Sequence, residues 1–381
     1  MEMSELKKHV RTLATLPEAD APVISCYLEL LNGKIKDRDI YNDLSRTVIV
    51  GLREQKLYNV QKAQESVAKY LKNNLLPNSK GAAIYSRAGN NPFFLPLQFR
   101  VPLPNWVSLS LTPNIYHLVE MKDTYHRYVV MISTKKSARI VEINLGEVTA
   151  QLWQEREELR ERVGREWTKE HYQKHSHERG VKFIKEKIKI LEQIFLSGGH
   201  THLILAGHPT MTSRVRNELP KHLLEKLVDE VSISGQAKTT NIVEATISSF
   251  VKSEEKESQI IAEVLSQKIH AGGLAVAGSE ASILALQHGN VDTVVLLTDY
   301  SPDPFWMCLA CGFANLKNEK PVSCPQCGST SLKLSDLKEE MVRLAEIQGC
   351  LIEVVNESET LEKLGGVGCL LRYRLFNEYA C

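Results

Sequence analysis

The sequence predicts an α/β protein of more than one domain, with an α+β arrangement in its N-terminal part. With 381 residues, the chain has the length of two or three domains of common size. Its central and C-terminal parts alternate apolar strand-like runs with segments of helical spacing, which favours parallel or mixed sheets. In the N-terminal part, helical segments are instead followed by several short strand-like pieces.

The N-terminal part begins with a predicted helix at residues 4–16. The segment VISCYLEL at 23–30 alternates as a strand with one buried face does. Residues 38–76 are predicted to form helices. The pieces GAAIYS, FFLPLQF and VSLSL, which follow them, are predicted to be short strands.

The central part contains two predicted strands, RYVVMIS at 127–133 and ARIVEINLG at 138–146, joined by the turn TKKS. Residues 155–170 are highly charged and lack an apolar stripe wide enough for a core. Residues 181–195 have apolar side chains at helical spacing, with three lysines on a different face, and THLILAG at 201–207 is a predicted buried strand. The segments RVRNELPKHLLEKLVDEV and IVEATISSFVKSEEKESQIIAEVLSQKI are both predicted to be helical.

The C-terminal part repeats a helix and strand order. A helix is predicted at roughly 279–288, and the next strand, VDTVVLL, is a continuous apolar run, as expected when helices cover both faces of a sheet. The segment EEMVRLAEIQGCLIEVV adds another helix and strand, and GGVGCLLRY adds a last strand. The segment SGGH at 197–200 lies between a helix and a strand, so it favours a helix C-cap over a phosphate loop.

Composition excludes several classes of protein. The net charge is +1, so any RNA-binding surface must be local. No run of eighteen apolar residues is present, and the N-terminal segment lacks the apolar core of a signal peptide. We therefore expect a cytoplasmic protein that does not cross a membrane. The sequence contains no G-x-S-x-G elbow, Walker loop or H-E-x-x-H motif, and so gives no independent sign of an enzyme.

Four of the eight cysteines form the most specific motif in the sequence. Cys308, Cys311, Cys324 and Cys327 form two C-x2-C pairs separated by twelve residues, and a glycine follows each pair. Two intervening residues let both thiolates of a pair bind one tetrahedral ion, so the motif predicts a structural zinc ribbon. The alternative is a redox pair or four unrelated thiols. Of the remaining cysteines, Cys381 is unassigned, and the other three are predicted to be buried thiols: Cys26, Cys350 and Cys369.

The order of features in the last third resembles that of a known family. Four segments follow one another here in the order AGSEASILALQHGNVDTVVLL, a four-cysteine ribbon, LKEEMVRLAEIQGCLIEVV and GGVGCLLRY. This order resembles that of the last domain of archaeo-eukaryotic class-I peptide chain release factors and Pelota. Three earlier segments resemble parts of the first two domains of this family: KGAAIYSR, RYVVMISTKKSARIVEINLGEV and FLSGGHTHLILAGHPTMTSRVRNELPKHLLEKLVDEVSISG. The resemblance implies a decoding-type domain at 1–120, a central domain at 121–268 and an α/β domain of Pelota type at 269–381, with the ribbon at 306–330.

Two functional motifs of the family are altered here. Release factors carry a Gly-Gly-Gln loop before the helix that matches 181–195, and this loop helps to place the water that hydrolyses peptidyl-tRNA. The corresponding residues read HYQKHSHERG, and no GGQ occurs in the chain. Gln173 is an isolated glutamine at this position. The family's Asn-Ile-Lys-Ser decoding motif has its nearest match in NDLSR, which supplies Asn42, Ser45 and Arg46.

The resemblance therefore implies a ribosome-binding factor without release chemistry. Pelota is a precedent for the loss of GGQ, and the bacterial relatives called Balon, which occupy the ribosomal A site during hibernation together with a translational GTPase, are a closer functional analogy. On this hypothesis the protein is a monomer with ribosomal RNA as its partner. The altered segment is then an extended RNA-binding loop with these residues: Arg162, Arg165, Tyr172, Lys174, His175, His177 and Arg179.

Two alternatives remain open for the altered segment, and two remain open for the protein. The first alternative for the segment is a solvated charged helix. The second is a histidine metal site, although no further ligands stand nearby in the sequence. The protein is a peptidyl-tRNA hydrolase that uses Gln173 or a histidine, or it is a binding module that kept the fold but left the ribosome.

Overall fold

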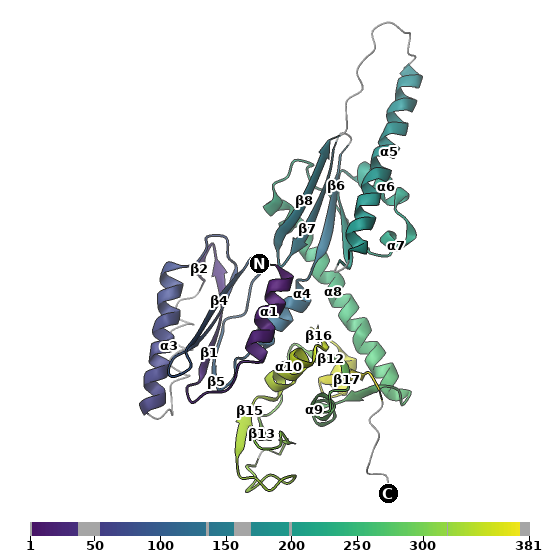
Figure 1. Cartoon of the computed structure of the whole chain (residues 1–381). Helices are drawn as coiled ribbons and strands as arrows, with labels where there is room; N and C mark the ends of the chain where they lie inside the picture. Colours follow the sequence, from purple (N-terminus) through teal and green to yellow (C-terminus); the bar gives the residue numbers. More distant parts are fainter. Residues whose placement is uncertain are drawn as a thin grey trace. The chain divides into compact units, whose positions relative to one another are not determined.

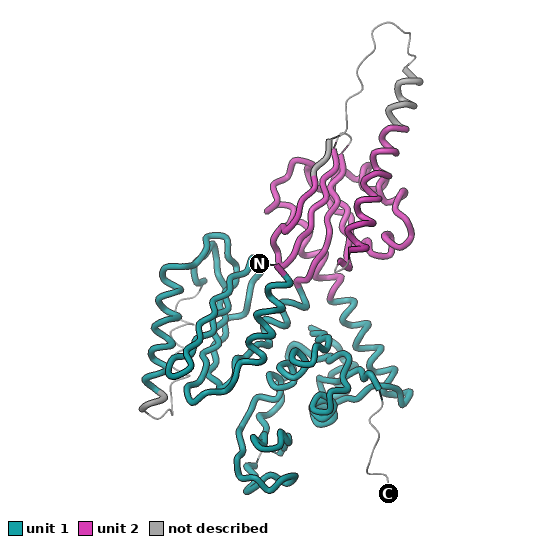
Figure 2. Tube along the Cα trace, viewed as in Figure 1, with its two compact units in different colours: residues 1, 3–124, 255–381 teal, residues 2, 125–254 magenta. Residues whose placement is uncertain are grey.

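The computed structural model describes residues 2–36, 54–134, 137–155, 169–197, 200–317 and 319–373 (Figure 1). The chain divides into two compact units, which Figure 2 shows in different colours. Unit 1 contains residues 3–124 and 255–381, and unit 2 contains residues 125–254. The division into three domains predicted from the sequence stays a prediction.

The N-terminal segment of unit 1 is built on an antiparallel sheet. Its strands are β1 (Val23–Leu31), β2 (Lys34–Ile35), β3 (Gly81–Arg87), β4 (Phe93–Phe99) and β5 (Trp106–Ser110), and β1 pairs with β2, β3 and β5. Helix α3 (Glu54–Asn73) buries Val60, Val67 and Leu71 against β1 and β3, because these residues lie on one helical face. The segment also contains α1 (Met3–Ala14) and α4 (Tyr116–Thr124).

Unit 2 is a mixed sheet with the strand order β10-β9-β6-β7-β8. The strands β10 (Leu227–Val231), β9 (His202–Gly207) and β6 (Tyr128–Ser133) are parallel, whereas β7 (Ser137–Asn144) and β8 (Glu147–Glu155) continue from β6 as antiparallel neighbours. The predicted strands at 127–133, 138–146 and 201–207 are thus confirmed. The prediction that the segment ending LVDEV is helical is wrong in its last part, because this part pairs with β9 as strand β10.

Helices cover both faces of this sheet. Because side chains alternate along a strand, Val129 and Met131 of β6 pack on the side of α5 (Lys169–Leu196), α6 (Pro209–Glu218) and α7 (Lys221–Leu224). Val130 and Ile132 face the opposite side, where they pack against the first half of α8 (Thr239–His270). Both faces of β6 are therefore buried, as its apolar sequence predicts.

The C-terminal segment of unit 1 has a second mixed sheet, with the order β11-β17-β12-β16. Its strands are β11 (Ala275–Ala277), β12 (Val291–Leu297), β16 (Leu351–Val355) and β17 (Val367–Leu371), and its helices are α9 (Ser279–Gln287), α10 (Leu337–Gln348) and α11 (Glu359–Lys363). The predicted helices and strands of this region, and the mixed α/β class, are confirmed. A smaller sheet between β12 and α10 in the sequence contains β13 (Phe305–Cys308), β14 (Ala314–Asn315) and β15 (Leu332–Ser335).

None of the helices in the described parts of the chain combines the length and the apolar character that crossing a bilayer requires.

Candidate functional site

The four predicted metal ligands lie together in the small sheet of unit 1. Cys308 ends β13, and the turn after it supplies Cys311, while Cys324 and Cys327 lie in a second turn before β15. The two turns have the same hydrogen bonds, because the N–H of the following glycine donates to the carbonyl of the first cysteine in each: Gly312 to Cys308 at 2.8 Å and Gly328 to Cys324 at 2.9 Å.

Gly312 and Gly328 have φ values of 78° and 72°, in the left-handed region that glycine adopts without strain. The sequence therefore specifies both turns through the glycine that follows each cysteine pair.

The distances between the sulfur atoms fit a tetrahedral metal ion. The Sγ atoms of Cys308 and Cys327 are 3.6 Å apart, as are those of Cys311 and Cys324, and all four lie within 4.8 Å of one another. Four thiolates at about 2.3 Å from a zinc ion are separated by about 3.8 Å in a regular tetrahedron. The cluster is thus able to hold a metal ion, and its all-sulfur donor set is the type that zinc and iron–sulfur centres use.

The thiol groups of the cluster differ in their pKa values. The N–H of Cys311 lowers the pKa of Cys308 to about 6, so this thiol is deprotonated at neutral pH. At Cys311, the N–H of Phe313 favours the thiolate, but desolvation and the neighbouring thiols raise the pKa to about 12. A divalent cation among the four sulfurs would favour the thiolate form of all four cysteines.

The remaining cysteines agree with the prediction of buried thiols. Cys26, Cys350 and Cys369 are free and buried in the structure, and burial raises the pKa of each.

The segment HYQKHSHERG is helical, so the expectation of an extended loop is wrong for its described part. Helix α5 starts at Lys169, twelve residues before the predicted start at 181. The physical reason lies in the composition, because residues 169–179 contain neither proline nor glycine, and the charged residues that prevent a core there are compatible with a helix.

Helix α5 carries most of the predicted RNA-binding residues. The backbone positions of Tyr172, Lys174, His175 and His177 lie on its first turns, and Arg179 is exposed, whereas Arg162 and Arg165 lie outside the described residues. The decoding-motif residues Asn42, Ser45 and Arg46 also lie outside them.

The second half of α5 is amphipathic. Phe183, Ile188 and Leu191 are buried against the sheet of unit 2. On the exposed side, basic residues recur every three to four positions, which places them on one stripe of the helix: Arg179, Lys182, Lys185 and Lys189. Lys185 forms an ion pair with Glu218 at 3.4 Å, and exposed glutamates flank the stripe at 178 and 186. The stripe is therefore a local basic feature on a chain of nearly zero net charge.

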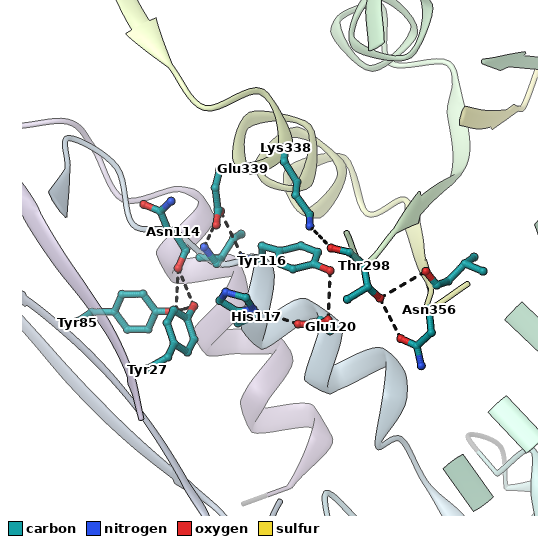
Figure 3. Close-up of polar contacts among 12 residues, drawn as sticks. Tyr27, Tyr85, Asn114, Tyr116, His117, Glu120, Thr298, Lys338, Glu339 and Asn356 are labelled. Carbon is teal, nitrogen blue, oxygen red and sulfur yellow. Dashed lines mark hydrogen bonds and ion pairs between the residues drawn. The ribbon is translucent and has the colours of Figure 1, made fainter. Parts of the chain in front are cut away.

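A network of polar contacts in unit 1 could not be read from the sequence (Figure 3). The carboxyl group of Glu339, in the first turn of α10, accepts hydrogen bonds through Oε2 from the N–H groups of Ile115 at 2.8 Å and Tyr116 at 3.3 Å. These groups stand at the N-terminus of α4, where donors lack partners within the helix. The ammonium of Lys338 lies 3.6 Å from the ring centroid of Tyr116 and donates to the carbonyl of Thr298.

Two buried tyrosines extend this network into the N-terminal sheet. The hydroxyl groups of Tyr27 and Tyr85 lie within hydrogen-bonding distance of each other and of the carbonyl of Asn114 (Figure 3). Because each hydroxyl has one proton, two of these three contacts are hydrogen bonds at any one time. The N–H of Asn114 donates to the hydroxyl of Ser25 at 3.0 Å. The network thus connects α10 with the segment before α4 and with strands β1 and β3.

One family model and two curated proteins match parts of this chain. Residues 113–250 match the model of the family described as Bacterial archaeo-eukaryotic release factor family 10. Peptide chain release factor subunit 1 of Thermococcus onnurineus is 28% identical over 214 residues, which cover 50% of this chain and 51% of that protein. The protein of the same name from Pyrococcus abyssi is 27% identical over 205 residues, with 47% and 49% covered. The chain spans about half the length of the curated relatives it matches.

Solved structures of the same class are similar over more of the chain. The crystal structure of an archaeal translation termination factor is 16% identical, with 98% of this chain and 99% of that chain covered and a TM-score of 0.27. Pelota of Archaeoglobus fulgidus is 15% identical, with 77% and 80% covered and a TM-score of 0.37.

The match at residues 113–250 and the similarity to two archaeal release factors support a place for this chain in the superfamily of release factors and Pelota.

Proposed function

We propose that this protein is a translation factor that binds in the A site of the ribosome, in hibernation or rescue, and does not hydrolyse peptidyl-tRNA. Membership of the superfamily supports the ribosome as its partner. The observation that carries the proposal is the altered segment on α5, which holds HYQKHSHERG where release factors hold Gly-Gly-Gln. Two glycines permit close approach of the backbone, and the amide positions water. This segment has no pair of adjacent glycines, and its one amide side chain, Gln173, is not preceded by glycine.

The basic stripe of α5 supports a contact with RNA. Its four cations lie on the same helix as the positions of Lys174 and His177. The buried apolar residues of this helix pack in the core of unit 2. Cations that contact phosphates release counterions, so the affinity they provide falls with rising salt. A helix that is anchored at its C-terminal half presents such cations without the cost of ordering a loop.

We further propose that the ion held by the four cysteines is zinc, because a closed site of four thiolates is typical of structural zinc. We also propose a decoding-type role for residues 1–120, a translational GTPase as a second partner and a monomeric state. These proposals rest on the family resemblance.

Sedimentation with ribosomes through sucrose gradients over a series of salt concentrations tests the contact. Replacing Lys174 and Arg179 by alanine should weaken co-sedimentation and flatten its salt dependence, since about two phosphate contacts are lost. The double variant Lys221→Ala and Lys252→Ala removes two exposed lysines of unit 2 outside α5 and should behave as wild type. Failure of the wild-type protein to sediment with any ribosomal state would favour a binding module without a ribosomal role. Equal binding of the first double variant would exclude the α5 contact.

A further inference from the structure

A second set of metal-ligand side chains lies in unit 2. His126 stands between α4 and β6, His202 is the first residue of β9, and Glu254 belongs to α8. One nitrogen of each imidazole and one carboxylate oxygen lie within 4.8 Å of one another. These residues lie 52 residues or more apart in the sequence, so no local motif predicts that they come together.

The distances among these atoms fit one metal ion at their centre. Oε1 of Glu254 is 3.0 Å from Nδ1 of His202 and 3.2 Å from Nε2 of His126. Nitrogen and oxygen ligands at about 2.0–2.1 Å from a tetrahedral zinc ion are separated by about 3.3 Å. The three atoms thus converge on one point at the spacing that a shared ion requires.

The hydrogen bonding of the group leaves one buried oxygen unsatisfied. Oε1 of Glu254 is inaccessible to solvent and has no hydrogen-bond donor among the described residues, although both ring nitrogens are close to it. Those nitrogens instead lie 2.9 Å and 2.7 Å from the hydroxyl oxygen of Thr201. An unsatisfied buried carboxylate oxygen is costly, and a bound cation would remove this cost.

Aromatic packing holds both imidazoles in place. The ring of Phe250 lies edge-on to the rings of His126 and His202, with centroids 5.2 Å and 5.3 Å away, and stacks on Tyr128 at 4.4 Å. Phe250 and Glu254 are four residues apart on α8, so the residue that fixes the imidazoles and the residue that supplies the carboxylate share one helical face. The ligands are therefore oriented before an ion binds, as an effective metal site requires.

Exposure and ligand type indicate which ion fits. The side chains of His202 and Glu254 are 3% and 13% exposed, whereas that of His126 is 26% exposed, so the group is open to solvent at His126. Imidazole nitrogen selects zinc and other late transition metals over magnesium and calcium, which prefer oxygen ligands. Three protein ligands leave a further position for water.

We propose that His126, His202 and Glu254 bind one divalent transition-metal ion of the zinc class, with water completing its coordination. The ion joins the first residue of β9 to α8 and stabilises unit 2. This inference is independent of the ribosomal function, because it rests on contacts within unit 2 alone.

Zinc content after equilibrium dialysis of the full-length protein tests the site. Wild type should hold about two zinc ions per chain, one of them at the four cysteines, and His126→Ala and Glu254→Gln should each hold about one. The matched control is Glu142→Gln, which removes a carboxylate that contacts a single buried histidine, His200, at 2.8 Å. This control should retain about two ions.

A cobalt difference spectrum gives a second readout that does not depend on total metal content. Both proteins are depleted of zinc and loaded with Co²⁺. Wild type should show additional visible absorption that His126→Ala lacks, and the thiolate charge-transfer bands of the cysteine site should be the same in both. Because the side chain of His126 is partly exposed, this variant should keep the far-ultraviolet circular dichroism of wild type. About one zinc in wild type, about two in both variants, or identical cobalt spectra would each overturn the proposal.

Discussion

Glu339 is a carboxyl group whose environment opposes its charge. Desolvation by the surrounding protein, followed by the nearby charge of Asp336, raises its pKa to about 8, although the N–H groups of Ile115 and Tyr116 favour the carboxylate. The unfolded chain releases this proton near the ordinary glutamate pKa of about 4.3. Between these two values the folded state binds more protons than the unfolded state, so stability falls as pH rises through this window.

We predict that Glu339→Gln removes this part of the pH dependence. The amide keeps an acceptor oxygen for the α4 N-terminus and carries no charge. From pH 5 to pH 8, wild type should lose on the order of a few kcal/mol of stability relative to the variant. Urea unfolding of both proteins across this range measures the difference. The variant Glu359→Gln, at a side chain that is 90% exposed, should follow wild type, and parallel curves for Glu339→Gln and wild type would show that the group does not titrate in this window.

The cysteine cluster leads to a prediction at the same scale. Cys311→Ser removes one thiolate at an exposed position, so an incomplete tetrahedron remains and the chain should lose one zinc ion relative to wild type. Cys350→Ser replaces a buried thiol outside the cluster and should retain the metal. Atomic absorption of the purified proteins measures both. Equal zinc content in all three proteins would mean that the cysteines are not the ligands.

The candidate sites differ in how far the sequence predicts them. The cysteine pairs and their glycines are local, so their spacing alone predicts the turns and the ligand set. Glu339 meets Ile115, 224 residues earlier in the chain, and Glu254 meets His126 across a whole domain. Such pairs are brought together by tertiary structure, and no periodicity in the sequence marks them.

Helix α5 is the element on which the proposed function depends. We predict that His177→Pro weakens ribosome binding, because proline removes a backbone hydrogen bond and disturbs the preceding turn of the helix at a cost of about 3 kcal/mol or more. The melting temperature should change little, since among the α5 side chains that the structure describes, from residue 178 onward, the first buried one is Phe183. Gradient sedimentation and thermal unfolding measure the two effects.

His177→Ala provides the control for this experiment, because it removes the imidazole and keeps the helical backbone. A loss of binding in the proline variant alone shows that the helical direction of residues 169–177 matters. Unchanged binding of the proline variant would contradict a role for this part of α5. Equal losses in both variants would assign the effect to the imidazole.

Element types were predicted best where one period dominates the sequence. The apolar runs of β6, β9 and β12 and the helical spacing after residue 181 all have the predicted structure. The segment LVDEV was assigned to a helix because it follows the helical residues KHLLEK without a proline or glycine between them. It becomes strand β10 because pairing with β9 satisfies its backbone groups, which is a tertiary effect.

At the start of α5, helical residues were not assigned to a helix. Residues 169–180 have no apolar stripe, and periodicity therefore gave no signal, although their helix propensity is sufficient to extend a helix that is anchored further along.

At the scale of the whole molecule, a net charge of +1 provides no general attraction to nucleic acid. The proposed binding to ribosomal RNA must therefore come from local features such as the basic stripe of α5, and its salt dependence should reflect few contacts. The proposed function has the ribosome as its partner, and the altered segment is the reason why peptide release is not part of the proposal. The central claim thus has two parts, binding and the absence of hydrolysis.

The most direct test measures both parts in one reaction. Ribosomes that carry labelled peptidyl-tRNA and a stop codon in the A site are mixed with the purified protein, and the bound protein and the released peptide are quantified from the same sample. An active release factor serves as the positive control, and buffer alone as the negative control. We predict that the protein occupies the ribosomes while peptide release stays at the level of buffer. Release at a rate near that of the positive control would contradict the account.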